Sequence, residues 1–336
     1  MVWRCYYFKR LQRGIYGEDN MKKIKYICFA FLAFAVIIAA GSYYFVDYAM
    51  ARQDNDQDYY KSYQHVKKAY PQTVQWLDSL EFAHALKDTT IINRDGVRLH
   101  AKFAYAKQPT GKTAIMVHGY TDNANSMLMI GYIYSEKLGF NILLPDNYAH
   151  GYSEGKYIQM GWKDRLDIKE WLEFANRLFI LPDEETRMVV HGISMGAATT
   201  MMLSGDTLKP YVKCFVEDCG YTSVWDEFKG ELKKRFHIPA FPFLYTADWL
   251  NKIKNGWSFK EASALQQVRK CKQPMFFIHG DKDTFVPTSM VYELYEAKPE
   301  PKYLWVTQGT AHALSYYDYP EKYEKNISEF IQRYIP

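Results

Sequence analysis

The stretch Met188-Val189-Val190-His191-Gly192-Ile193-Ser194-Met195-Gly196-Ala197-Ala198-Thr199-Thr200 decides the fold. An apolar run, a turn of the pattern Gly-x-Ser-x-Gly and a run of small residues follow one another here. This order predicts a buried strand, a sharp turn and a helix, with Ser194 at the turn. A serine hydroxyl is a poor nucleophile until a base takes its proton, so it must project from such a bend. Gly192 and Gly196 omit the side chains that would collide where strand and helix nearly touch.

The pattern alone is weak, because a Gly/Ser turn in any α/β domain can match it by chance. It gains meaning only if a histidine, an acid and an oxyanion hole follow in a suitable order along the chain.

Composition limits the classes of function. A chain of 336 residues can hold one α/β domain with an insertion. Aromatic residues make up 17%, which fits core packing and also an aromatic-lined cleft. The net charge of +4 is too small to indicate nucleic-acid binding. Neither a Walker A loop nor a Gly-x-Gly-x-x-Gly pattern occurs, so we expect no nucleotide cofactor and no nucleic-acid partner.

The five cysteines form no Cys-x-x-Cys pair. The cysteines therefore give no zinc-binding or thioredoxin-like signal. We expect a site with no metal and no cofactor. Cys214 and Cys271 lie near the starts of two strands that we expect to be neighbours, so a disulfide between them is conceivable. Buried free thiols are the commoner case.

An uncharged apolar run, Tyr26–Val46, is long enough to cross a hydrocarbon core of about 30 Å as a helix. The positive-inside rule places its N-terminal side in the cytoplasm and the rest of the chain outside. That rule rests here on the flanking charges, which are Lys22, Lys23 and Lys25 before the run and Asp47, Asp54, Asp56 and Asp58 after it.

The same run has a second interpretation, a cleaved signal peptide with small residues at 39–42 as the cleavage site. A buried core helix is a third. The residues from Met21 resemble the start of a bacterial export signal, which would make 1–20 an upstream extension. No lipobox cysteine follows. We expect the organisation to be 1–25 cytoplasmic, 26–46 transmembrane, 47–88 a helical linker and 89–336 the catalytic domain.

Apolar strands alternate with amphipathic helices from residue 89 to the end, which predicts a mostly parallel sheet covered by helices on both faces. Asp95-Gly96 separates two β-rich runs and predicts a hairpin. The alternation stops over 223–268, where helical, aromatic-rich segments predict a small cap inserted over the site.

The order Ser, acid, His identifies candidates for a triad. His312 is the only histidine after the loop that carries Asp281 and Asp283, so it is the candidate base for Ser194. Asp283 is the preferred acid, and its task is to hold the histidine tautomer and stabilise the imidazolium. Asp281 fits a turn-shaping role, whereas Asp218, at the end of an earlier strand, remains a real alternative acid.

Five pieces of the chain together resemble the α/β-hydrolase superfamily, in particular its serine-aminopeptidase-like and Gram-positive cell-surface branch. The resemblance covers about 90–336 and implies the same fold and triad. The chain departs from it at 147–149, where many relatives carry an Arg. The matching pieces are His118-Gly119, Asp146 with the run 150–155, the turn 192–196, the run His279–Pro287 and His312.

The His-Gly pair after the strand 112–117 indicates an oxyanion hole. We expect the backbone N–H groups of Tyr120 and Met195 to be its two donors. The side chain of His118 fits better as a packed core histidine.

These features favour a serine hydrolase, most simply a carboxylic-ester hydrolase anchored at the outer face of a membrane. Its substrate would be a small-molecule ester or acyl compound. A peptidase or acyltransferase with the same triad is the alternative, and a non-catalytic surface binding protein is a third hypothesis. The sequence leaves the acyl group, the alcohol and the oligomeric state open.

Overall fold

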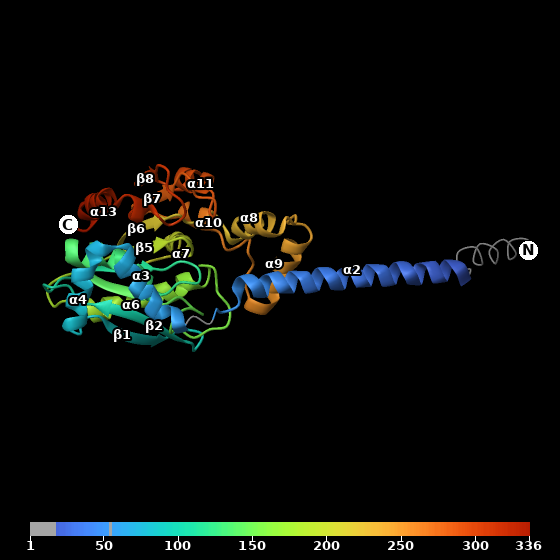
Figure 1. Ribbon diagram of the computed structural model, residues 1–336, viewed down its shortest axis with the longest axis horizontal. Helices are drawn as coiled ribbons and strands as arrows, with labels where there is room; N and C mark the ends of the chain where they lie inside the picture. Colours follow the sequence, from blue (N-terminus) through green and yellow to red (C-terminus); the bar gives the residue numbers. More distant parts are fainter. Residues whose placement is uncertain (1–17, 54–55) are drawn as a thin grey trace, which may run out of the picture.

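The computed structural model describes residues 18–53 and 56–336, and its centre is an eight-stranded sheet (Figure 1). The strand order is β1-β2-β4-β3-β5-β6-β7-β8. The expected hairpin pairs β1 with β2 antiparallel, β2 pairs antiparallel with β4, and all later pairs are parallel. The strands are β1 (Lys87–Ile92), β2 (Arg98–Ala104), β3 (Lys112–Val117), β4 (Asn141–Pro145), β5 (Arg187–Ile193), β6 (Val212–Asp218), β7 (Met275–Gly280) and β8 (Lys302–Thr307).

Two buried apolar clusters, one on each face of the sheet, hold the helices in place. This double covering explains why the central strands are apolar without alternation. One cluster includes residues of α6 (Asp164–Phe179), α7 (Met195–Ser204), α10 (Ala264–Val268) and α11 (Ser289–Ala297). The other includes residues of η2 (Ala124–Met127), α5 (Leu128–Tyr132), η3 (Ile133–Lys137), α12 (Ser315–Asp318) and α13 (Pro320–Tyr334). The predicted α/β-hydrolase architecture is confirmed.

The segment expected as a helical linker forms helices that pack onto the domain. It forms α3 (Asp56–Ala69), η1 (Pro71–Thr73) and α4 (Val74–Phe82). Val66, Trp76 and Leu77 are buried in the second cluster. Helices 56–82 therefore cover part of the sheet.

The apolar N-terminal run lies in one long helix, α2 (Glu18–Met50), which projects from the body (Figure 1). It is the one helix among the described residues long and apolar enough to cross a membrane. All its described side chains up to residue 37 are exposed, and burial begins at Ile38. Its last turns pack against the inserted cap, which comprises α8 (Val224–Phe236), α9 (Phe243–Asn255) and the segment leading to α10.

The thiol side chains of Cys214, Cys219 and Cys271 are free and buried. The conceivable disulfide between Cys214 and Cys271 is therefore wrong. Cys5 lies outside the described residues.

Candidate active site

Ser194 sits at a strained turn between β5 and α7, as the sequence predicts. Its backbone angles, a φ of 57° and a ψ of −118°, lie in a region that residues other than glycine rarely adopt. A Cβ on Gly192 would lie 2.1 Å from the carbonyl oxygen of Gly196, and one on Gly196 would lie 1.9 Å from that of Val117. Only glycine fits at either position, so the two glycines are what allow the bend.

Three side chains from separate loops meet at this turn. His312 Nε2 lies 2.8 Å from Ser194 Oγ, and His312 Nδ1 lies 2.6 Å from Asp283 Oδ2. Both are hydrogen-bond distances. Ser194 is 8% exposed and Asp283 is 6% exposed, while the ring of His312 is more open to solvent. The structure thus brings together the three residues predicted to form a triad.

Asp283 is held in its ionised form. Burial raises the pKa of its carboxyl, but hydrogen bonding to His279 and His312 outweighs burial, and the pKa falls to about 2. Its other oxygen, Oδ1, accepts the backbone N–H groups of Phe285 and Val286, each at 2.9 Å. The loop therefore fixes a charged carboxylate against the imidazole.

The two other candidate acids are occupied elsewhere. Asp218 accepts hydrogen bonds from Tyr323 at 3.0 Å and Ser315 at 3.4 Å, and burial raises its pKa to about 6. Asp281 Oδ1 accepts the backbone N–H of Gly309 at 2.6 Å, as expected for a residue that shapes the turn. Neither carboxylate hydrogen-bonds to His312 among the described residues.

The expected oxyanion donors also flank the serine. Gly119 lies against Ser194, so the following residue, Tyr120, is placed beside the turn. Met195 is the first residue of α7, where an N–H has no acceptor within its own helix. The backbone N–H of Tyr120 makes no hydrogen bond within residues 18–53 and 56–336. Two adjacent free donors fit an oxyanion hole.

His118 is fully buried and accepts the backbone N–H of Asn147 at Nε2 over 2.9 Å. This agrees with its interpretation as a packed core histidine. Asn147 follows Asp146 at the position where the resemblance to the α/β-hydrolase branch leads one to expect Arg. Its side chain also donates a hydrogen bond to the carbonyl oxygen of His118 at 3.1 Å. The pair joins the loops that follow β3 and β4.

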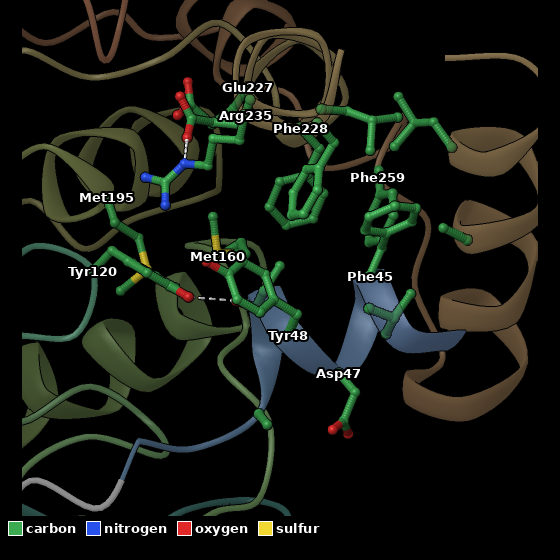
Figure 2. A pocket seen from close by; sticks show the side chains of 18 of the residues that line it. Phe45, Asp47, Tyr48, Tyr120, Met160, Met195, Glu227, Phe228, Arg235 and Phe259 are labelled. Carbon is green, nitrogen blue, oxygen red and sulfur yellow. Dashed lines mark hydrogen bonds and ion pairs between the residues drawn. The ribbon is translucent and has the colours of Figure 1, made fainter. Parts of the chain in front are cut away.

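A pocket of about 560 Å³ opens onto Ser194. Its walls come mainly from the cap, from Tyr120 and from the last turns of α2, and most of them are apolar. Figure 2 shows Phe45 and Tyr48 of α2 around the same space as Phe228 of α8 and Phe259. The aromatic-rich cap expected over the site is therefore part of the pocket wall.

Two buried residues at the site carry no signal in the sequence. Glu227 on α8 lines the pocket, and burial, followed by repulsion from Glu231 and Asp283, raises its pKa to about 8. On an amphipathic helix such a residue looks like part of a solvated face. Cys219 lies with Asp283 and His312 in a cluster that could hold a metal ion, but burial raises its pKa well above the usual value, so it stays a neutral thiol. Asp283 and His312 already bond to one another.

Comparison with known proteins identifies the family. A model of the prolyl oligopeptidase family matches residues 136–336, a range that includes Ser194, Asp283 and His312. The chain belongs to the prolyl oligopeptidase family. The match extends from η3 to the end of the chain, so it also includes the cap.

One sequence relative and two solved structures are similar to this member of the prolyl oligopeptidase family. Uncharacterized protein YqkD of Bacillus subtilis (strain 168) is 30% identical over 230 residues, which cover 67% of this chain and 73% of YqkD. The esterase Pf2001 of Pyrococcus furiosus is 26% identical, with a TM-score of 0.61 over 76% of this chain and 96% of the esterase. An acylaminoacyl peptidase of Pyrococcus horikoshii, 17% identical, shares the fold with a TM-score of 0.57 over 77% of this chain and 43% of its own. These neighbours confirm the α/β-hydrolase fold and support a serine hydrolase.

Proposed function

We propose that the chain is a serine hydrolase that cleaves carboxylic esters through an acyl-enzyme. The observation that carries the proposal is the unbroken hydrogen-bonded series Ser194–His312–Asp283, whose serine lines a mostly apolar pocket. A hydroxyl aligned with an imidazole whose other nitrogen faces a carboxylate is an activated nucleophile.

The geometry supports a two-step reaction. Ser194 Oγ attacks the ester carbonyl carbon while its proton passes to His312 Nε2, and the N–H groups of Tyr120 and Met195 receive the oxyanion. The C–O bond to the alcohol then breaks, and His312 returns the proton to the departing oxygen. In the second step a water gives a proton to His312 and attacks the acyl carbon. The bond from that carbon to Ser194 Oγ then breaks, and His312 returns the proton to Oγ, which releases the acid and restores Ser194.

We further infer that α2 is a retained anchor and that the catalytic domain lies outside the membrane. Two packing contacts support retention, because they fall on the residues where a signal peptidase would cut. A Cβ on Gly41 would lie 2.9 Å from the ring of Phe243, and Ser42 Oγ donates to the carbonyl oxygen of Phe243 at 3.0 Å. The outward orientation rests on the lysines before the apolar run.

A fluorophosphonate probe tests the activated serine. We expect the probe to label the native chain at Ser194 and to leave Ser194→Ala unlabelled. The same variant, with an unchanged circular dichroism spectrum, should lose all turnover of p-nitrophenyl esters. Equal turnover by the variant would refute the assignment. Faster cleavage of aminoacyl anilides than of esters would replace the esterase with a peptidase that uses the same residues.

A further inference from the structure

The anchor helix α2 is also a wall of the active-site pocket. Phe45, Val46 and Tyr48, from its last turns, line the pocket that opens onto Ser194. A simple tether would end before the catalytic domain and leave the pocket to other elements. Here the same helix continues from an exposed apolar segment to within the site (Figure 1).

Specific contacts hold the last turns of α2 against the rest of the domain. The ring of Phe45 packs edge-on against Phe236 of α8 and Phe243 of α9, with centroids 4.9 and 5.9 Å apart. The carbonyl oxygen of Met50 accepts the backbone N–H of Ile158 at 2.6 Å. Because packing and hydrogen bonds hold these last turns, the direction of α2 relative to the pocket is fixed.

The exposed part of the apolar run of α2 is too short to span the hydrocarbon core by itself. Its exposed part, 26–37, rises only about 18 Å, whereas a hydrocarbon core is about 30 Å thick. The remaining apolar turns, 38–46, are those that pack against the cap. A bilayer that covers the whole run must therefore reach α9, which crosses α2 where this helix leaves the body (Figure 1).

The exposed face of α9 suits that position. Tyr245, Trp249 and Ile253 recur every four residues on α9 and are 49, 62 and 65% exposed, and Phe241, two residues before the helix, is 72% exposed. Spacing by four places residues on one side of a helix. We call these four residues the α9 stripe. Such an exposed apolar row marks an interaction surface, and aromatic side chains are typical of the membrane interface.

Basic residues next to the α9 stripe strengthen the case for a lipid surface. Lys252 and Lys254 flank Ile253 on the same helix and are exposed. The ammonium group of Lys254 lies 4.8 Å from the ring centre of Tyr43 on α2. Lysines and tyrosines at this boundary can place their polar ends among lipid headgroups while their apolar parts stay below.

A row of aromatic rings connects the apolar run with the pocket. Tyr44 stacks on Tyr48 at 6.1 Å, and Tyr48 meets Phe236 edge-on at 5.8 Å. Among the lining residues, Tyr48, Gln53 and Arg235 are the exposed ones, so the mouth of the pocket lies beside α2. A pocket of about 560 Å³ falls within the ~300–1,000 Å³ of sites that enclose a whole small ligand.

We propose that the site takes its substrate directly from the bilayer, and that this substrate is a long-chain acyl ester whose chain passes along α2 into the pocket. The α9 stripe lies in the interface and holds the mouth at the lipid surface. This proposal rests on the ester hydrolase proposed above and names the class of its substrate.

The first test compares two substrates of the full-length chain in phosphatidylcholine–phosphatidylglycerol vesicles. One is a water-soluble butyrate ester, and the other is a palmitate ester embedded in the same vesicles. We expect the double variant Trp249→Glu/Ile253→Glu to hydrolyse butyrate within twofold of the native rate and palmitate at least tenfold more slowly. The matched control Ile180→Glu/Tyr292→Glu adds two charges at exposed apolar positions away from the cap and should change neither rate.

The outcomes separate the two proposals. An undiminished palmitate rate in the α9 double variant, or an equal loss in the control, would overturn the membrane-delivery proposal and leave the esterase intact. If the native chain hydrolyses neither ester and the fluorophosphonate probe does not label Ser194, the proposed function itself fails.

A second measurement reports how deeply residue 253 lies in the bilayer and does not depend on catalysis. An environment-sensitive fluorophore is attached at Ile253→Cys, with Cys5 and the exposed Cys28 replaced by Ser. We expect blue-shifted emission and quenching by lipids with a doxyl group on the acyl chain. The control Glu329→Cys, on α13, should report water. A fluorophore at 253 that reports water, or one that is shielded but unquenched by the lipids because a second protein copy covers it, would overturn the proposal.

Discussion

The hydroxyl of Tyr120 donates a hydrogen bond of 2.8 Å to the backbone carbonyl of Ala49, and this bond joins the loop after β3 to helix α2 (Figure 2). The residue whose N–H is proposed to stabilise the transition state is thus held by α2. Positioning of such a donor matters because an oxyanion hole acts only when its N–H groups are already in place.

Tyr120→Phe tests this connection. The variant keeps the backbone N–H and loses only the bond to Ala49, whose net worth is about 0.5–1.5 kcal/mol. We expect kcat for a butyrate ester to fall about three- to tenfold while KM changes less than twofold. Steady-state kinetics provide the measurement. A rate equal to that of the native chain would show that α2 does not position the loop.

The choice between Asp283 and Asp218 can be decided by two matched substitutions. Asp283→Asn should lower kcat by about 10³-fold or more, because the amide no longer fixes the tautomer of His312. Asp218→Asn should cost less than tenfold, since that carboxylate bonds to Tyr323 and Ser315. Rates are compared at pH 7.5 with thermal unfolding as the folding control. The reverse ranking would make Asp218 the acid.

Glu227 predicts a pH dependence of stability. Its pKa is about 8 in the folded chain, against an ordinary value of 4.5, mainly because of burial. Between these values the folded chain holds a proton that the unfolded chain has lost, so the free energy of unfolding decreases as pH rises from about 4.5 to 8. The slope from one such group is about 1.4 kcal/mol per pH unit at most.

Glu227→Gln should remove that part of the slope. We expect the variant to match the native chain near pH 5 and to be more stable near pH 8. Urea unfolding across this range provides the measurement. Identical pH profiles for the two chains would show that Glu227 does not titrate with a raised pKa.

Two glycine substitutions test the packing at the turn. Gly196→Ala places a Cβ 1.9 Å from the carbonyl oxygen of Val117, so it should prevent folding or lower the melting temperature by more than 10 °C. Gly230→Ala, in α8, meets no atom within 4 Å and should stabilise the chain by about 0.5–1 kcal/mol. Calorimetry compares the two. Tolerance of Gly196→Ala would contradict the close approach of strand and helix.

The sequence was enough to predict the parallel sheet and the meeting of Ser194, Asp283 and His312, because strand ends and chain order constrain them strongly. It was not enough to predict the role of α2 in the pocket. An apolar run gives the same pattern whether lipid or protein covers a given turn. The boundary at Ile38 depends on where the cap lies, and the cap is distant in sequence.

The burial of Glu227 could not be predicted from the sequence for a related reason. Charged residues of α8 are interspersed with apolar and aromatic ones, as on any amphipathic helix. Only the fold reveals that part of its polar side faces a pocket. Sequence periodicity tells which residues share a helix face but not what that face meets.

Gly41→Leu tests whether docking of α2 is needed for function while leaving the proposed membrane anchor itself intact. Leucine preserves the helix and its apolar character, but its side chain would enter the space of the Phe243 ring, since a Cβ alone would lie 2.9 Å away. Overpacking of this kind costs about 1–3 kcal/mol. We expect a lower melting temperature and a palmitate rate that falls more than the butyrate rate. Ala40→Leu, one residue earlier and exposed, is the matched control and should change neither. Both variants should remain in the membrane fraction. If Gly41→Leu behaves like Ala40→Leu in unfolding and in both rates, the contact between α2 and α9 is not what holds the pocket in shape.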